Sequence, residues 1–155
     1  MVPYPEQARA VERLKDFQLR RYIVDLGALL DWTRARSNGR VVGLGICFGG
    51  PFLLRFAAEA RLSGGVTWHG SRMESFLDRA GRHHVPPRMH FGAADPIAPP
   101  EAIDKIRAAF AGHPDVSIAV HPGAVHGYAP GGDAHDAAAR QAGLDATHEL
   151  LEYLA

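Results

Sequence analysis

Apolar and polar positions along the chain predict short buried strands separated by amphipathic helices. Four runs have strand character, because each is short, largely apolar and bounded by turn residues. Apolar residues at helical spacing appear between these runs and at both ends of the chain. The predicted strands cover 41–46, 65–69, 88–92 and 116–120, and the predicted helices cover 5–36, 51–61, 71–80, 99–112 and 134–155.

The alternation of strands and helices predicts an α/β fold. Strands separated by helices form βαβ units, so we expect a mainly parallel sheet of about four strands with helices on both faces. At 155 residues, the chain is expected to form a single domain over 1–155. An alternative for residues 1–20 is a helical arm attached to that domain. In a parallel sheet the chemistry collects beyond the carboxyl ends of the strands. The loops after Ile46, Gly92 and Val120 are therefore the places where we expect a site.

Composition and charge exclude several classes of protein. Hydrophobic residues make up 46% and charged residues 22%, a balance typical of globular proteins rather than disordered ones. Seventeen basic residues offset seventeen acidic ones, so we expect no nucleic-acid partner. The sequence shows no apolar segment long enough to span a membrane and no apolar signal core near Met1. Together with a single cysteine, which cannot form an internal disulfide, these features predict a cytoplasmic protein with no membrane partner.

The first loop carries a pattern that is typical of a nucleophile on a sharp turn. Gly45 to Gly49 read G-x-C-x-G between a predicted strand and a predicted helix, which is the G-x-S-x-G elbow with cysteine in place of serine. We expect that side chains in place of Gly45 and Gly49 would clash across this turn. The N-terminus of the following helix would lower the pKa of the Cys47 thiol, and the Phe48 backbone amide would stabilise an oxyanion. A small buried residue in a glycine-rich turn is the alternative interpretation of Cys47.

The other two loops carry an acid and a histidine. Asp95 follows the third predicted strand and His126 follows the fourth. Taken singly, Asp95 is better explained as a turn residue and His126 as a solvated loop histidine. Together with Cys47 they keep the order nucleophile, acid, histidine that an α/β-hydrolase triad has. We therefore expect Cys47 to attack an acyl carbonyl, His126 to act as general base and then acid, and Asp95 to orient the imidazole.

These segments resemble the dienelactone hydrolases, or carboxymethylenebutenolidases, of the α/β-hydrolase superfamily. The resemblance rests on SNGRVVGLGICFGG around Cys47 and on the preceding VDLGALLDWTR. It also rests on the steps of 48 positions from Cys47 to Asp95 and 31 positions from Asp95 to His126. It covers roughly residues 20–155. The resemblance implies a Cys-His-Asp triad that cleaves a small ester or lactone through an acyl-enzyme, with no cofactor and no metal.

The resemblance also implies sheet strands for which this sequence offers no candidates. Family members have several strands before the elbow strand, whereas residues 1–40 precede it here and their pattern is helical. The family's second oxyanion donor and activating glutamate are implied in that region, and neither has a counterpart in this sequence. We therefore expect the N-terminal half of the usual sheet to be missing and the strand 41–46 to form an exposed apolar edge. Such an edge favours either a homo-oligomer or a chain whose true start lies upstream.

The substrate-binding residues of the family are matched only in part. Dienelactone hydrolases hold a carboxylated lactone with arginines, one of them shortly after the catalytic histidine, but 127–130 contain no arginine here. Arg72, in the loop after the second predicted strand, is a candidate substitute. A different small ester, lactone or thioester is therefore at least as good a substrate candidate. Trp68, Phe91 and Tyr128 are candidate pocket walls near strand ends, and a place in the core explains each of them equally well.

Two hypotheses from other classes remain open. The first is a truncated, catalytically weak relative that acts as an interaction or oligomerising protein, because the region implied to supply the second oxyanion donor is missing. The second is metal binding, because nine histidines are many for a chain of this length. No H-E-x-x-H or C-x-x-C spacing supports a metal site. The histidines considered for it are His83, His84, His90, His121, His126 and His135.

Overall fold

The computed structural model describes residues 9, 12, 18–82, 85, 87–130 and 134–154. Contacts divide the chain into two units, Met1–Gly39 and Arg40–Ala155. In the first unit, helix α2 (Leu19–Arg34) corresponds to the later part of the helix predicted over 5–36, and most of the earlier part lies outside the described residues. The second unit contains the sheet and every candidate site residue. A single domain for the whole chain stays a prediction.

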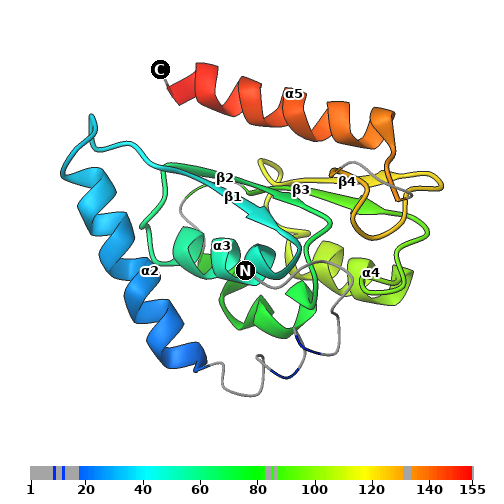
Figure 1. Ribbon diagram of the computed structural model, residues 1–155, viewed down its shortest axis with the longest axis horizontal. Coiled ribbons are helices and arrows are strands. Elements are labelled where there is room, and N and C mark those ends of the chain that lie inside the picture. Colours follow the sequence, from blue (N-terminus) through cyan, green and yellow to red (C-terminus); the bar gives the residue numbers. More distant parts are fainter. Residues whose placement is uncertain are drawn as a thin grey trace. The chain divides into compact units, whose positions relative to one another are not determined.

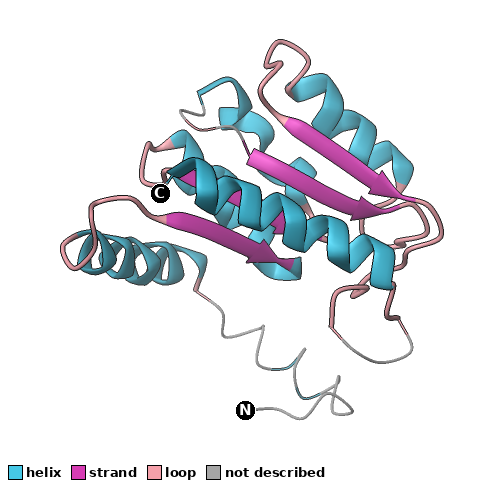
Figure 2. Ribbon diagram, turned by 90° about the horizontal axis from the view of Figure 1, so that it is seen from above, coloured by secondary structure: helices cyan, strands magenta, loops and turns pink. Residues whose placement is uncertain are grey.

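The second unit is built on a four-stranded sheet. The strands pair in the order β1-β2-β3-β4, and every neighbouring pair is parallel, which confirms the predicted sheet. The register sets Ile46 beside Trp68 and Gly92 beside His121, so the carboxyl ends of the strands lie along one edge (Figure 2). The strands are β1 (Val42–Ile46), β2 (Gly64–Trp68), β3 (Pro87–Gly92) and β4 (Ser117–His121).

Helices cover both faces of this sheet, as predicted. One face carries α3 (Gly50–Ala58), the 3-10 segment η2 (Met73–Arg82) and α4 (Pro100–Ala109), and the other carries α5 (Ala137–Leu154) (Figure 1). A short 3-10 turn, η1 (Cys47–Gly49), leads from β1 into α3. None of the described helices combines the length and the apolar character that crossing a membrane requires.

Each face of the sheet has its own hydrophobic cluster. Met89 and Phe91 of β3 belong to the cluster that includes residues of α3, η2 and α4. Val66 and Trp68 of β2 belong to the cluster that includes Leu150 of α5. Every residue of β2 is buried, which is typical of a parallel strand that is covered on both sides. The site is thus supported by a sheet with a packed core on each face.

Strand β1 lies at one edge of the sheet. Among the described residues, β2 is its one strand partner. Leu44 and Ile46 of β1 are 46% and 45% exposed, although both are large and apolar. The described part of the chain therefore has the exposed apolar edge strand that the sequence predicts.

The loops after β3 and β4 are joined through their backbones. The Ala93 amide donates to the His121 carbonyl oxygen at 2.9 Å, and the Ala94 amide donates to the Ala124 carbonyl oxygen at 3.0 Å. Gly92 permits this close approach, because a Cβ at that position would lie 2.2 Å from the Ala124 oxygen. The two loops that carry the predicted acid and histidine are therefore held side by side.

We expect Gly92→Ala to destabilise the fold by about 1–3 kcal/mol, because the added methyl group forces the Ala124 backbone away from β3. Gly112→Ala is the matched control, since a Cβ at Gly112 would meet no atom within 4 Å. Urea unfolding followed by circular dichroism measures both differences from the wild type. Equal free energies of unfolding for Gly92→Ala and wild type would contradict the proposed close approach.

Candidate active site

Cys47 stands on a strained turn directly after β1. Its backbone φ is 49°, in the left-handed region that non-glycine residues rarely adopt. Such backbone strain costs about 1–3 kcal/mol and is found most often at functional sites. A Cβ on Gly45 would lie 2.9 Å from the Gly49 carbonyl oxygen. Glycine at position 45 therefore lets the turn close, as the elbow pattern requires.

The second close contact of the elbow lies one position later than expected. A Cβ on Gly49 would meet no atom of the described residues within 4 Å, so the expected clash is absent there. A Cβ on Gly50, in contrast, would lie 3.0 Å from both the Gly70 Cα and the Met73 Sδ. The reason is that η1 occupies the turn, so the first residue of α3 is the one that passes close to the loop after β2. The steric role predicted for Gly49 therefore belongs to Gly50.

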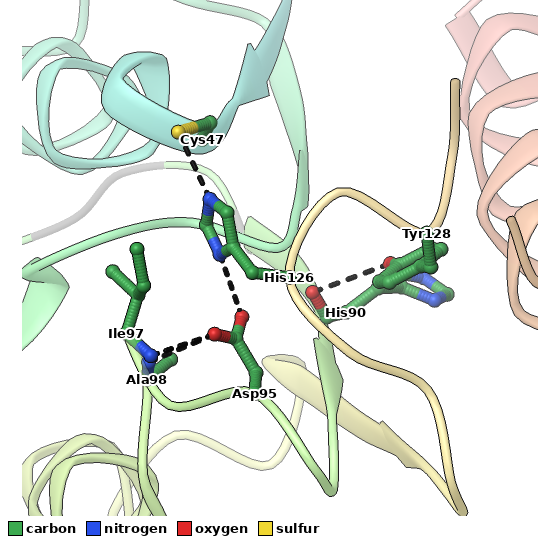
Figure 3. Close-up of polar contacts among 7 residues, drawn as sticks. All are labelled: Cys47, His90, Asp95, Ile97, Ala98, His126 and Tyr128. Carbon is green, nitrogen blue, oxygen red and sulfur yellow. Dashed lines mark hydrogen bonds and ion pairs between the residues drawn. The ribbon is translucent and has the colours of Figure 1, made fainter. Parts of the chain in front are cut away.

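Asp95 is buried in the loop after β3. Its side chain has no exposed surface. Its Oδ1 accepts hydrogen bonds from the Ile97 amide at 2.8 Å and the Ala98 amide at 3.3 Å. These two bonds fix the carboxylate and leave Oδ2 for another donor (Figure 3).

His126 links this carboxylate to the thiol. Its Nδ1 lies 2.8 Å from Asp95 Oδ2, and its Nε2 lies 3.1 Å from Cys47 Sγ (Figure 3). An ionised carboxylate can only accept, so Nδ1 is the donor of the first bond. The structure therefore brings Cys47, His126 and Asp95 into one hydrogen-bonded chain, with the histidine in the middle.

Hydrogen bonding among Cys47, His126 and Asp95 favours the ionised form of the Cys47 sulfur. The hydrogen bond from His126, with a further contribution from nearby His69, lowers the pKa of the Cys47 thiol from 9.0 to about 6. The hydrogen bonds to Asp95 and Cys47 raise the pKa of His126 from 6.5 to about 9. Between these two values a thiolate faces an imidazolium. The thiolate is the nucleophilic form of cysteine, so the pair is poised for attack near neutral pH.

Asp95 stays ionised in this surrounding. Burial by itself would raise the pKa of the carboxyl. The hydrogen bond from His126 and those from the Ile97 and Ala98 amides outweigh burial, and the pKa lies below its ordinary value of 3.8. The carboxylate can therefore stabilise the imidazolium beside it.

The Phe48 amide lies beside the nucleophile. Its N–H also contributes to the lowered pKa of Cys47, which indicates that it is directed at the sulfur. Cys47 itself begins η1, which continues into α3, so the thiol lies at the N-terminal end of this helical segment. The backbone donor predicted from the elbow pattern thus lies at the atom that would attack.

Known proteins match this chain in sequence and in fold. The family model described as "Dienelactone hydrolase family" matches residues 3–154. The chain belongs to the dienelactone hydrolase family. It is 29% identical over 115 residues to the carboxymethylenebutenolidase of Pseudomonas sp. (strain P51), a match that covers 73% of this chain and 48% of that protein. It is 26% identical over 119 residues to carboxymethylenebutenolidase 1 of Cupriavidus pinatubonensis (strain JMP 134 / LMG 1197), covering 76% and 51%. The chain spans about half the length of these curated relatives.

Solved structures share the fold of this chain. A dienelactone hydrolase-like promiscuous phosphotriesterase from metagenomic libraries has a TM-score of 0.78 at 23% identity, covering 99% of this chain and 70% of that one. Esterase 2 of Thermogutta terrifontis, phosphorylated by paraoxon, has a TM-score of 0.66 at 18% identity, covering 85% and 63%. At these identities the likeness shows the α/β-hydrolase fold alone.

The three aromatic residues predicted as pocket walls lie in the core of this family member. Phe91 is buried in the cluster on the α3 and α4 face, and Trp68 and Tyr128 are buried in the cluster beneath α5. Trp68 packs so closely on α5 that a Cβ on Gly143 would lie 2.8 Å from its Nε1. Strand side chains point to the helix-covered faces, which explains the positions of Phe91 and Trp68. These surroundings favour the core interpretation over the pocket interpretation.

Arg72 lies at the surface, in the loop that borders the elbow. The amide of the preceding residue, Ser71, donates to the Cys47 carbonyl oxygen at 3.0 Å. Arg72 is exposed and has a positive φ of 55°. The structure therefore places Arg72 next to a backbone contact of the nucleophile.

His69 borders the triad although no motif marks it. Its ring lies edge-on to the His126 ring, with 4.8 Å between the ring centroids. His69 follows β2 as Cys47 follows β1, and the last residues of these strands, Ile46 and Trp68, are paired. The rule that sites collect after strand ends therefore also applies to the loop after β2, and His69 in the segment TWHG is the signal it offers.

Most of the histidines considered for metal binding have other surroundings. His90 and His121 are stacked, with 3.1 Å between His90 Nδ1 and His121 Nε2. Burial, followed by the neighbouring His121, lowers the pKa of His90 to about 4, so His90 is neutral near pH 7. His135 is exposed, and His83 and His84 lie outside the described residues.

The rate of Cys47 alkylation by iodoacetamide reports the charge of the sulfur. Iodoacetamide reacts with the thiolate, and the pKa of the Cys47 thiol is about 6. We therefore expect fast labelling at neutral pH, with a labelling rate that falls only as the pH drops through about 6. In His126→Ala the main hydrogen-bond partner is lost, so the pKa returns toward 9.0 and labelling at neutral pH slows. Intact mass, measured over time at each pH of a series, gives the labelling rates.

His135→Ala is the matched control for this experiment, because it removes an exposed histidine that is not a member of the triad. It should label like the wild type. A native protein that labels at neutral pH only after unfolding would contain a buried structural thiol instead.

Proposed function

We propose that this dienelactone hydrolase family member cleaves small esters or lactones with Cys47 as nucleophile, His126 as general base and acid, and Asp95 as the orienting carboxylate. The single observation that carries the proposal is the unbroken chain from Asp95 Oδ2 through His126 to Cys47 Sγ, at 2.8 and 3.1 Å. Family membership adds support, because relatives of this chain are named carboxymethylenebutenolidases.

The charges of the pair suit acyl transfer in two steps. In the first, the Cys47 thiolate attacks the carbonyl carbon, the carbon–oxygen bond to the leaving group breaks, and His126 gives its Nε2 proton to the departing alkoxide. In the second, His126 takes a proton from water, the resulting hydroxide attacks the thioester, and the thiolate leaves. The Asp95 carboxylate stabilises the imidazolium at both stages. The Phe48 amide is the backbone donor that we assign to the developing oxyanion.

The side chains around the triad favour an uncharged, apolar substrate. An exposed large apolar residue lies close in sequence to each member of the triad: Phe48 follows Cys47, Ile97 follows Asp95 by two positions, and Val125 precedes His126. These three side chains are between 37% and 48% exposed. Residues 127–130, directly after His126, contain no arginine. We therefore infer a preference for neutral alkyl or aryl esters and lactones over carboxylated ones, with Arg72 as the nearest candidate for an acidic group.

A panel of neutral and carboxylated esters and lactones tests the proposal. We expect hydrolysis of the neutral members and, for slowly hydrolysed esters, an acyl adduct on Cys47 that intact mass detects. Cys47→Ala should form no adduct and lose hydrolysis, because the attacking atom is gone. His126→Ala should lower the rate by about 10²–10⁴-fold, the usual contribution of a positioned general base.

His135→Ala is again the control and should hydrolyse the panel at the wild-type rate. Hydrolysis that survives in Cys47→Ala would assign the activity to other residues. A folded wild type that hydrolyses no member would favour the second function below.

The second candidate function is that of an interaction protein which self-associates through β1. The observation that favours it is the exposed apolar edge strand, whose outer side has no strand partner among the described residues. Edge strands of this kind pair readily with other chains. Both functions can coexist, because the triad lies at the carboxyl edge of the sheet and the unpaired side of β1 runs along its length.

Light scattering on the purified chain tests this second candidate. We expect a mass of at least two chains, and we expect Leu44→Lys to shift the mass toward one chain, because a lysine on an edge strand opposes pairing. Leu151→Lys changes an equally exposed leucine of α5 and should leave the mass unchanged. A wild type with the mass of one chain and a cooperative thermal transition would rule out this assembly.

A further inference from the structure

Among the described residues, the buried imidazole of His69 has no hydrogen-bond partner. The residue is only 3% exposed, and its Nδ1 and Nε2 are both buried and unpaired within the part of the chain that the structure describes. Leaving a buried polar group unpaired costs about 1–3 kcal/mol. His69 lies close enough to Cys47 to lower the pKa of the thiol, yet neither ring nitrogen has the geometry of a hydrogen bond. The proposed hydrolysis does not use this side chain.

The surroundings of His69 hold its ring beside the thiol. The His69 amide donates to the His90 carbonyl oxygen at 2.9 Å, which fixes the backbone. The ring is packed edge-on against His126 at 4.8 Å and against Tyr128 at 5.2 Å between centroids. The sheet register adds to this, because Cys47 and His69 leave neighbouring strands at paired positions.

Three metal-type ligand atoms therefore converge at one point. The Cys47 Sγ and one ring nitrogen from each of His69 and His126 all lie within 4.8 Å of one another. In a tetrahedral zinc site with Zn–S of about 2.3 Å and Zn–N of about 2.0–2.1 Å, the ligand atoms lie about 3.3–3.6 Å apart. The observed separation of 3.1 Å between Cys47 and His126 has to open slightly, and a separation at the 4.8 Å limit has to shorten by about 1 Å. Both are side-chain adjustments.

We propose that Cys47, His69 and His126 form a binding site for Zn²⁺, with water at the fourth position, and that zinc holds the protein in an inactive state. The binding of zinc stands on the ligand geometry alone, whereas the inactivation rests on the proposed function. A thiolate with two imidazoles is a soft to borderline ligand set that suits zinc and does not suit Mg²⁺, which prefers oxygen ligands.

The remaining bonds of the triad complete a zinc site. His126 keeps its Nδ1 hydrogen bond to Asp95, and a carboxylate behind a ligating histidine is the usual second partner in zinc sites. The Nε2 proton that His126 shares with Cys47 must leave to solvent, because the coordinating nitrogen has to be free. Zinc thus takes the thiolate and the histidine that acyl transfer needs, which makes it an inhibitor and gives it no part in the hydrolysis.

Direct titration of the full chain with Zn²⁺ against a chromogenic zinc chelator tests the proposal. We expect one tight zinc per chain, no corresponding site for Mg²⁺, and zinc-dependent protection of Cys47 from iodoacetamide. His69→Phe keeps an aromatic ring in the core but removes the third ligand, so we expect at least about tenfold weaker zinc binding and a matching loss of protection. His69→Asn repeats the test with a smaller side chain if the phenylalanine variant does not fold.

His135→Phe, which removes an exposed histidine, should bind zinc like the wild type and so exclude His135 from the site. Zinc affinity that is equal in the wild type and in either folded His69 variant would overturn the proposal, as would the absence of a tight zinc. The proposed inactivation is tested by the inhibition of ester hydrolysis by zinc, with each variant's rate compared with its own zinc-free rate. A chain that binds zinc through His69 but hydrolyses no ester would contradict the proposed function and leave the zinc site standing.

Discussion

The buried hydrogen bond between Asp95 and His126 is the interaction on which the site depends. A fully buried carboxylate is stable only when its oxygens are paired, and here two backbone amides take one oxygen while the imidazole takes the other. That pairing turns Nε2 toward the sulfur and makes the ring basic enough to hold a proton. The charge on Cys47 is the consequence. The charge of the nucleophile therefore depends on a carboxylate that does not contact it.

The sheet places these groups with little freedom. Parallel pairing ends all four strands at one edge, and the close approach of Gly92 to Ala124 joins the acid loop to the histidine loop. At the other side of the site, the strained turn at Cys47 is held by its packing at Gly45 and by the Ser71 amide. The backbone strain at the nucleophile is thus sustained by contacts that lie outside the reacting groups.

Periodicity and strand-end logic predicted the sheet, its helical layers and the meeting of Cys47, Asp95 and His126, because each depends on short-range pattern and on one general rule of parallel sheets. Side-chain surroundings were harder to predict. Phe91 and Trp68 are aromatic residues near strand ends, but whether such a ring faces a helix or a loop depends on packing that one strand's sequence does not contain. The same holds for Gly49, since the 3-10 turn η1 leaves the tight contact to Gly50. The rule that functional residues follow strand ends also applies to His69, but His69 belongs to no motif that would single it out.

The bond between Cys47 and His126 joins residues 79 positions apart in the sequence. Closing so long a segment costs chain entropy, so we expect the bond to form only once β4 has docked on β3. A partly folded chain would contain an ordinary thiol, whatever helices it had formed. The pKa of the Cys47 thiol thus indicates whether the sheet has formed. It separates chains whose last strand is in place from those still assembling, and local opening of that strand would return the cysteine to its unreactive form.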